Sequence, residues 1–176
     1  MAPGRDHRDA SSAPGAQRKP RGTARDRALN LLSFRDRSRR ELEQRLLRAG
    51  YEPDEVLEAI GGLERVGLVD DERFARAIVE QHAGRRLAGR RAVAAALFTK
   101  GVDRETAAAA LRDLDEPGAE RERAEALARS RAGRLSGLAP EVAFRRLSGF
   151  LARRGYPPGI CHEAARAALA IDDDGA

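Results

Sequence analysis

One phrase returns three times along this chain, and every copy ends in a glycine. The copies are RSRRELEQRLLRAGY (37–51), GRRAVAAALFTKGV (89–102) and AFRRLSGFLARRGY (143–156). Their glycines, Gly50, Gly101 and Gly155, are 51 and 54 residues apart, and leucine or valine stands eight and four positions before each of them. A repeat of this period predicts an array of small units, each burying an apolar face partly against its neighbour.

Each copy predicts a helix together with its end. Residues four positions apart share one helix face, and glycine suits the left-handed position that ends a helix. Apolar residues at helical spacing flank each copy, and no segment alternates apolar and polar residues as a strand does. Within the expected helix 53–66, Gly61 and Gly62 predict a close helix–helix contact. Helices are expected at 25–35, 38–49, 53–66, 71–83, 87–100, 104–114, 119–132, 140–154 and 158–170.

The sequence therefore predicts an all-α fold, an elongated array of three tandem three-helix repeats at 24–69, 70–116 and 117–172. Residues 1–23 combine proline, glycine, serine and charged residues with almost no large apolar side chains. Such a segment cannot offset the entropy lost on ordering, so we expect a disordered basic tail there.

Charge is unevenly distributed along the chain, which carries a formal net charge of +5. Residues 52–72 hold eight acidic side chains and one arginine, whereas residues 85–100 hold five basic side chains and no acidic one. Basic segments of this kind favour nucleic acid, an anionic membrane surface or an acidic protein as a partner. They can also be solvated helix faces, and both interpretations stay open.

Pairs of arginines recur in the repeated phrase, with one arginine always ten residues before the glycine. A guanidinium group can bind a phosphate or a carboxylate through two hydrogen bonds. The same side chains could instead pair with Glu41, Glu43 or the acidic third helix of the first repeat. The absence of nearby acids in the sequence favours a partner contact at 85–91. The candidate partner-binding or DNA-binding residues are Arg39, Arg40, Arg85, Arg86, Arg90, Arg91, Arg145 and Arg146.

Enzymatic and metal chemistry have little support in the sequence. Cys161 is the one cysteine, and its neighbour His162 cannot complete a tetrahedral metal site with it. No phosphate-binding loop or nucleophilic-serine motif occurs. We therefore expect no catalytic residue, no metal and no cofactor. The sequence also has no apolar run long enough to cross a membrane and no secretory signal, so we expect a cytoplasmic protein without a membrane partner.

Residues 28–81 resemble the RecX family of bacterial regulators of the recombinase RecA, most clearly in RSRRELEQRLLRAGY and GLVDDERFA. The second repeat resembles the next family segment less strongly, with His82 where the family often has arginine, and the third repeat matches through the repeat pattern. The residues at positions where the family's recurrent residues are expected are Ser38, Leu42, Leu46, Gly50, Gly67, Asp70, Asp71, Phe74 and Ala75.

The resemblance implies a non-enzymatic modulator that docks along the groove of the RecA filament on single-stranded DNA, and we expect the chain to be a monomer. It would restrain filament growth, strand exchange and ATP turnover during DNA repair, recombination and the SOS response. Two alternatives from the residues remain. The chain could be a stand-alone DNA-binding helical protein without sequence specificity, or a scaffold for another protein that has no effect on nucleic acid.

Overall fold

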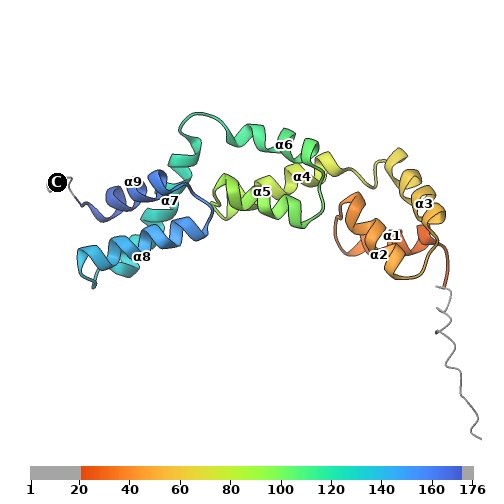
Figure 1. Ribbon diagram of the computed structural model, residues 1–176, viewed down its shortest axis with the longest axis horizontal. Helices are drawn as coiled ribbons and strands as arrows, with labels where there is room; N and C mark the ends of the chain where they lie inside the picture. Colours follow the sequence, from red (N-terminus) through yellow and green to blue (C-terminus); the bar gives the residue numbers. More distant parts are fainter. Residues whose placement is uncertain (1–20, 172–176) are drawn as a thin grey trace, which may run out of the picture.

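The computed structural model describes residues 21–171, which form three successive three-helix units in an elongated array (Figure 1). The predicted all-α array of three tandem three-helix repeats is confirmed, whereas most of the expected tail 1–23 lies outside the described residues. None of the described helices is both long enough and apolar enough to span a membrane. The helices are α1 (Ala24–Phe34), α2 (Arg39–Arg48), α3 (Pro53–Arg65), α4 (Asp71–Val79), α5 (Arg90–Thr99), α6 (Arg104–Leu111), α7 (Ala119–Ala132), α8 (Pro140–Arg153) and α9 (Pro158–Leu169).

Most helix starts have a local chemical cause. The side chains of Thr23, Ser38, Asp70 and Asp103 cap α1, α2, α4 and α6 by accepting hydrogen bonds from backbone N–H groups of the first turn. Proline occupies the first position of α3, α8 and α9, where its missing N–H costs nothing. These capping groups and prolines act on backbone groups only a few residues away. The helix starts that they predict therefore agree closely with the observed ones.

The connection between α4 and α5 differs from the expected helices 71–83 and 87–100. After Val79 the chain continues as a π-helix from Glu80 to Arg85, here called η1. Leu87 then adopts a positive φ of 46°, which a right-handed helix cannot contain. Helix α5 therefore begins at Arg90 and not at residue 87.

Each unit has its own apolar core, built around the second helix of that unit. The residues eight and four positions before the repeated glycine are fully buried in all three units. The three cores are separate clusters, and helices pack mainly against others of the same unit. The buried pairs are Leu42 and Leu46, Val93 and Leu97, and Leu147 and Leu151.

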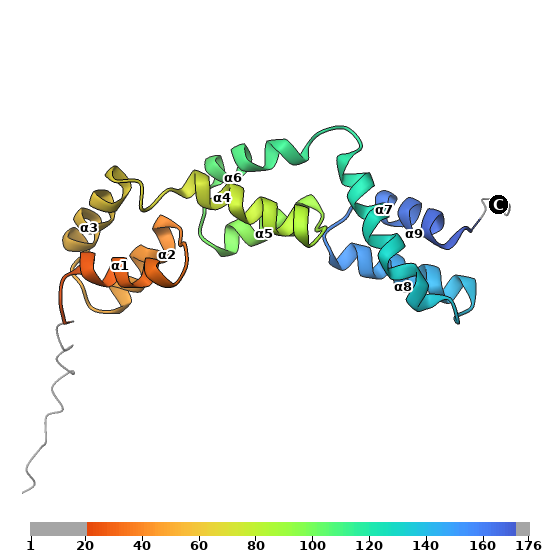
Figure 2. The ribbon, with the colours of Figure 1, turned by 180° about the vertical axis from the view of Figure 1, so that it is seen from behind.

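The units are joined end to end through their second helices. The Ser38 hydroxyl, at the start of α2, donates to the Lys100 carbonyl at the end of α5. The Gly89 N–H, at the start of α5, donates to the Arg154 carbonyl at the end of α8, at 2.9 Å. Helices α2, α5 and α8 therefore follow one another along the array (Figures 1 and 2). The carbonyl end of one helix meets the N–H end of the next, which aligns their dipoles favourably.

The glycine pair in α3 does not make the close helix contact that the sequence predicts. A Cβ added to Gly61 or Gly62 would meet only the guanidinium of Arg65, at 3.6 or 3.7 Å. Gly62 instead lines a hollow of about 300 Å³ at the surface of the first unit. The prediction was wrong because α1 and α2 pack against other faces of α3, where Val56, Ile60 and Leu63 are buried.

Candidate functional site

Two of the eight predicted arginines, Arg39 and Arg90, lie where successive units meet and have partners within the protein. Arg39 Nη1 lies 2.6 Å from Glu64 Oε2, and the Arg39 backbone N–H donates to Asp71 Oδ1 at 2.8 Å. The arrangement recurs one unit later. Arg90 Nε lies 2.5 Å from Asp115 Oδ1, and the Arg90 N–H donates to a carboxylate of α7 at 2.8 Å.

Asp71 and Glu120 act as helix caps from the next unit. Asp71 begins α4 and binds the first N–H of α2, whereas Glu120 lies in the first turn of α7 and binds the first N–H of α5. The first N–H groups of a helix have no partner inside it, so a carboxylate from outside satisfies them. Burial raises the pKa of Asp71, and the hydrogen bond from Arg39 opposes that shift. Each junction thus couples a helix start to the following unit.

The hydrogen bonds of Arg39 with Glu64 and of Arg90 with Asp115 raise the pKa of both guanidinium groups. No acid lies close to Arg90 in the sequence, but folding brings Asp115 to it from 25 residues away. Arg39 and Arg90 therefore have internal partners, which reduces their availability to another molecule.

The other six predicted arginines are exposed. Arg85 lies 3.6 Å from Glu80, but both side chains are more than 70% exposed, and such a pair contributes little to stability. Within residues 21–171 the guanidinium groups of the remaining five have no acidic partner and no hydrogen-bond acceptor. These five are Arg40, Arg86, Arg91, Arg145 and Arg146.

The exposed arginine of each repeat begins a stripe along the outer face of its helix. Residues four, seven and eight positions further along a helix share that face. In α2 and α5 all of these positions are exposed, and in α8 one of them, Gly149, is half-buried. We call these residues the spine stripe: Arg40, Gln44, Leu47 and Arg48 in α2, Arg91, Ala95, Phe98 and Thr99 in α5, and Arg145, Gly149, Ala152 and Arg153 in α8.

Where α2 meets α5, the two parts of the spine stripe line one hollow of about 540 Å³, here called the junction hollow. Phe98 stands in its lining with 80% of its surface exposed, the largest value among the exposed large apolar residues of the described chain. Two cations, Arg40 and Lys100, line the hollow without an acidic partner in the described part of the chain. The lining residues are Arg35, Arg40, Glu41, Gln44, Phe98, Thr99, Lys100 and Gly101.

The one acid in the junction hollow, Glu41, is already neutralised by its own neighbours. Arg35 and Arg45 donate to Glu41 Oε1 at 2.6 and 2.9 Å, and Arg37 donates to the same oxygen. Burial raises the pKa of Glu41, but these three hydrogen bonds together lower it below its ordinary value. Glu41 therefore stays ionised, and its charge is matched within the first unit. The excess charge of the hollow is positive.

Phe98 is not among the residues predicted from the sequence, although its position in the helical period marks it. Phe98 lies seven residues after Arg91, so the helical period places it on the polar face and not on the face of Val93 and Leu97. A large aromatic residue on a polar helix face is unusual in a chain with only five phenylalanines. The spacing could have identified it.

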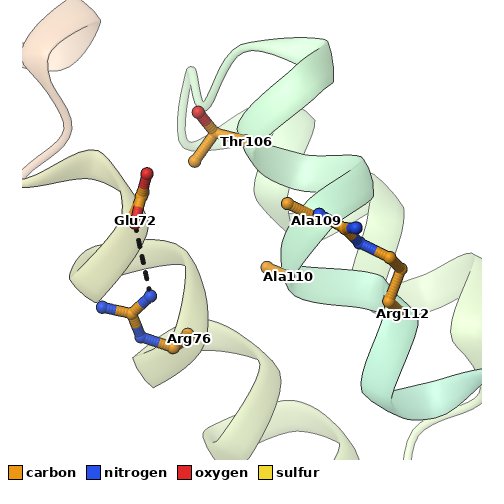
Figure 3. A pocket seen from close by; sticks show the side chains of 6 residues that line it. All are labelled: Glu72, Arg76, Thr106, Ala109, Ala110 and Arg112. Carbon is orange, nitrogen blue, oxygen red and sulfur yellow. Dashed lines mark ion pairs between the residues drawn. The ribbon is translucent and has the colours of Figure 1, made fainter.

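A second hollow, of about 490 Å³, lies between α4 and α6. Figure 3 shows Glu72 and Arg76 on α4, 3.5 Å apart, across from Thr106, Ala109 and Ala110 on α6. Arg112 completes its lining. Both members of the ion pair are mostly exposed, and no histidine or cysteine stands among these residues.

Cys161 and His162, the adjacent pair from which no metal site is expected, lie in different environments. Cys161 is buried in the core of the third unit, where burial raises the pKa of its thiol. His162 is exposed and lies 5.5 Å from the ring of Phe144. Within residues 21–171 no three side chains of histidine, cysteine, aspartate or glutamate gather as metal ligands do.

Family models match all three units of the chain. Residues 24–63 match the first three-helix domain of RecX, residues 70–111 the second and residues 119–164 the third. Together these matches cover more than half of the chain, and each falls on one unit of the array.

Similar proteins carry the same family name. The regulatory protein RecX of Mycolicibacterium smegmatis is 43% identical over 152 residues, which covers 84% of this chain and 80% of that protein. The regulatory protein RecX of Thermobifida fusca is 45% identical over 163 residues, covering 89% of this chain and 85% of that protein. The crystal structure of RecX from Lactobacillus salivarius superposes with a TM-score of 0.71 at 25% identity, covering 84% of this chain and 96% of that one.

Proposed function

This chain belongs to the RecX family of regulatory proteins, and we propose that it binds the RecA filament on single-stranded DNA and inhibits the recombinase and ATPase activities of RecA. In this proposal the protein is a cytoplasmic monomer that acts in DNA repair and recombination. It is not an enzyme and needs no cofactor.

The observation that carries this proposal is the recurrence of one exposed arginine on three helices joined end to end. Arg40, Arg91 and Arg145 occupy the same repeat position, and α2, α5 and α8 follow one another along the array. A filament is itself a repeating polymer of protein and DNA, so a repeating surface can contact it at several points at once. Contacts that are weak singly become strong together, because each one raises the effective concentration of the next.

The eight predicted arginines divide into two proposed roles. We assign direct contact with the filament to the six exposed residues. Arg39 and Arg90 would act indirectly, because their N–H groups bind carboxylates of the following unit while their side chains form ion pairs within their own unit. The residues proposed to contact the filament are Arg40, Arg85, Arg86, Arg91, Arg145 and Arg146.

The test mixes the purified chain with RecA on single-stranded DNA and measures ATP hydrolysis and strand exchange. Both rates should fall at substoichiometric to equimolar amounts of the chain, and unchanged rates would reject the proposal. The stand-alone DNA-binding alternative predicts that the chain binds DNA equally well with and without RecA and that its affinity falls steeply as salt rises, so salt titrations of binding with and without RecA separate the two.

A matched pair of variants connects the inhibition to the arginines. Arg40→Glu with Arg91→Glu should weaken inhibition, whereas Arg104→Glu with Arg134→Glu changes the net charge equally and should not. All four arginines are exposed, and the control pair lies outside the spine stripe. Far-ultraviolet circular dichroism checks that both double variants keep the helix content of the parent chain.

A further inference from the structure

We propose that the junction hollow and the spine stripe contact single-stranded DNA directly, with Phe98 stacking on an unpaired base and Arg40, Arg91 and Lys100 binding neighbouring phosphates. This inference rests on the proposed function and extends it, because it assigns one face of the array to the nucleic acid of the filament. The remaining faces are then available to RecA subunits.

The exposed ring of Phe98 favours a ligand with a flat, apolar face. Its ring is 80% exposed although it sits in the last turn of α5, where the Phe98 carbonyl accepts a hydrogen bond from the Gly101 N–H at 2.9 Å. The backbone that carries the ring is therefore held in place. A base that covers the ring removes apolar surface from water without requiring a specific hydrogen-bond pattern.

The surroundings of Phe98 favour a base over an apolar protein segment. A docked helix or strand buries a contiguous apolar patch, with its anchors in pockets lined by other apolar groups. In the junction hollow the ring has polar neighbours, including Arg40, Gln44 and Thr99. One aromatic ring bordered by cations is the combination that binds single-stranded nucleic acid, where the base stacks and the phosphates meet the charges.

The positive charges near Phe98 are placed to meet a phosphate backbone. Arg40 and Lys100 line the same hollow and have no acidic partner among residues 21–171. Arg91 lies on the same face of α5, seven residues before Phe98, which is about 10 Å along the helix axis. The C-terminal carbonyl of Lys100, which could repel a phosphate, is covered by the hydroxyl of Ser38.

Single strands fit this surface better than duplex DNA does. In a duplex the base faces are stacked on one another, so Phe98 could reach a base only after it had left the helix. The phosphate contacts alone would give weak binding without distinction between the two forms. The inference therefore predicts a preference for single strands that depends on Phe98.

The test uses a tryptophan at position 98, because the chain contains none. The Phe98→Trp variant is titrated with an oligothymidylate at low salt in the absence of RecA. Its fluorescence should be quenched on binding, and a duplex of equal length should quench it much less. A Leu57→Trp control places the reporter on the acidic helix α3, where residue 57 is 48% exposed, and its fluorescence should not change.

Affinity is measured separately through the anisotropy of a labelled oligonucleotide. Phe98→Ala should weaken binding by about fivefold or more, the usual effect of removing one stacking ring, while Phe98→Tyr should retain it. Arg40→Glu with Arg91→Glu should weaken binding and flatten its dependence on salt, because fewer counterions are released. The Arg104→Glu and Arg134→Glu pair serves again as the control of equal charge.

Three results would overturn the inference. The first is no oligonucleotide binding at low salt, and the second is binding that leaves the tryptophan of Phe98→Trp unquenched. The third is a fluorescence response to RecA without DNA but not to the oligonucleotide, which would make the hollow a protein contact. The proposed function would survive each of these results. The proposed function would be rejected, and the inference kept, if the oligonucleotide quenched the tryptophan while RecA kept its full ATPase activity in the presence of the chain.

Discussion

Gly155 at the end of α8 lies so close to Ala92 in α5 that a Cβ on Gly155 would be 2.5 Å from the Ala92 backbone nitrogen. Gly101 has the equivalent relation to Arg40, with a Cβ distance of 3.1 Å. Both glycines also have positive φ angles, 90° and 79°. The repeated glycine therefore meets two demands, since it ends a helix in a left-handed conformation and lets the preceding unit approach its backbone.

Replacing Gly155 with alanine should destabilise the protein by about 2 to 5 kcal/mol. The left-handed conformation accounts for about 1 to 2 kcal/mol, and forcing a methyl group into the contact with Ala92 adds about 1 to 3 kcal/mol. Gly67→Ala is the matched control, because Gly67 also has a positive φ of 71° but nothing within 4 Å of an added Cβ. It should lose only the conformational part. Equal losses in urea unfolding would show that the contact does not matter.

Although Arg90 and Arg91 are adjacent in sequence, substituting them should have different effects on stability and on the inhibition of RecA. Arg90→Ala removes the ion pair with Asp115 and should lower the free energy of unfolding by up to about 1 kcal/mol. Arg91→Ala removes no interaction seen in residues 21–171 and should change it by less than about 0.5 kcal/mol. In the RecA ATPase assay the order should reverse, with Arg91→Ala giving the larger loss of inhibition. If Arg90→Ala and Arg91→Ala melt at the same temperature, the ion pair of Arg90 does not stabilise the fold.

Gly61→Ala and Gly62→Ala should each stabilise the first unit by about 1 kcal/mol. Glycine in a helix interior is less favourable than alanine by that amount, and each new methyl group would meet only the mobile end of Arg65. Chemical denaturation of the two single variants measures the gain. A loss of stability in either variant would mean that α3 is packed at these positions.

The stability of the protein should fall between about pH 10 and 12 because of Tyr156. Its ring is 1% exposed, its hydroxyl donates to the Leu87 carbonyl at 2.7 Å, and burial raises its pKa to about 12. The unfolded chain loses this proton near pH 10, so at higher pH it binds fewer protons than the folded protein and unfolding becomes easier. The limiting slope is about 1.4 kcal/mol per pH unit for this one group.

Two variants isolate this effect. The free energies of unfolding of Tyr156→Phe and of the parent chain are measured from pH 9 to 12. The free energy of the variant should fall less steeply with rising pH than that of the parent chain. Tyr51→Phe leaves Tyr156 as the sole tyrosine, so ultraviolet absorbance reports its titration directly. A midpoint near 10 in the folded Tyr51→Phe variant would contradict the assignment.

The repeated phrase, the helical spacing around it and the lack of strand-like alternation were enough to predict the all-α class, the three-unit array and the buried residues of each second helix. Those features depend on periodicity and on capping groups that act over a few residues. Ser38, for example, caps α2 through the N–H of Glu41, three residues away. The predicted close packing of Gly61 and Gly62 was wrong because it depends on which face of α3 meets its neighbours.

The candidate site could be predicted only in part, since Arg39 and Arg40 are indistinguishable as adjacent arginines at the start of one helix. Their environments differ because Glu64, 25 residues further along, pairs with the guanidinium of Arg39, while the side chain of Arg40 stays exposed. The helical spacing indicates that Phe98 is exposed, but only folding brings residues of the first unit, such as Arg40 and Gln44, into the junction hollow beside it.

What the amino-acid order determined by itself was each helix, its buried stripe and most helix ends, because hydrogen bonds and side-chain contacts within a helix join residues three or four apart. What only the tertiary structure decided was how the units meet. Gly89 occupies the position of Ser38 in the second unit, yet a Cβ there would lie 2.6 Å from the Gly155 backbone. Such contacts join segments more than 60 residues apart, and their geometry exists only once both units have folded and come together.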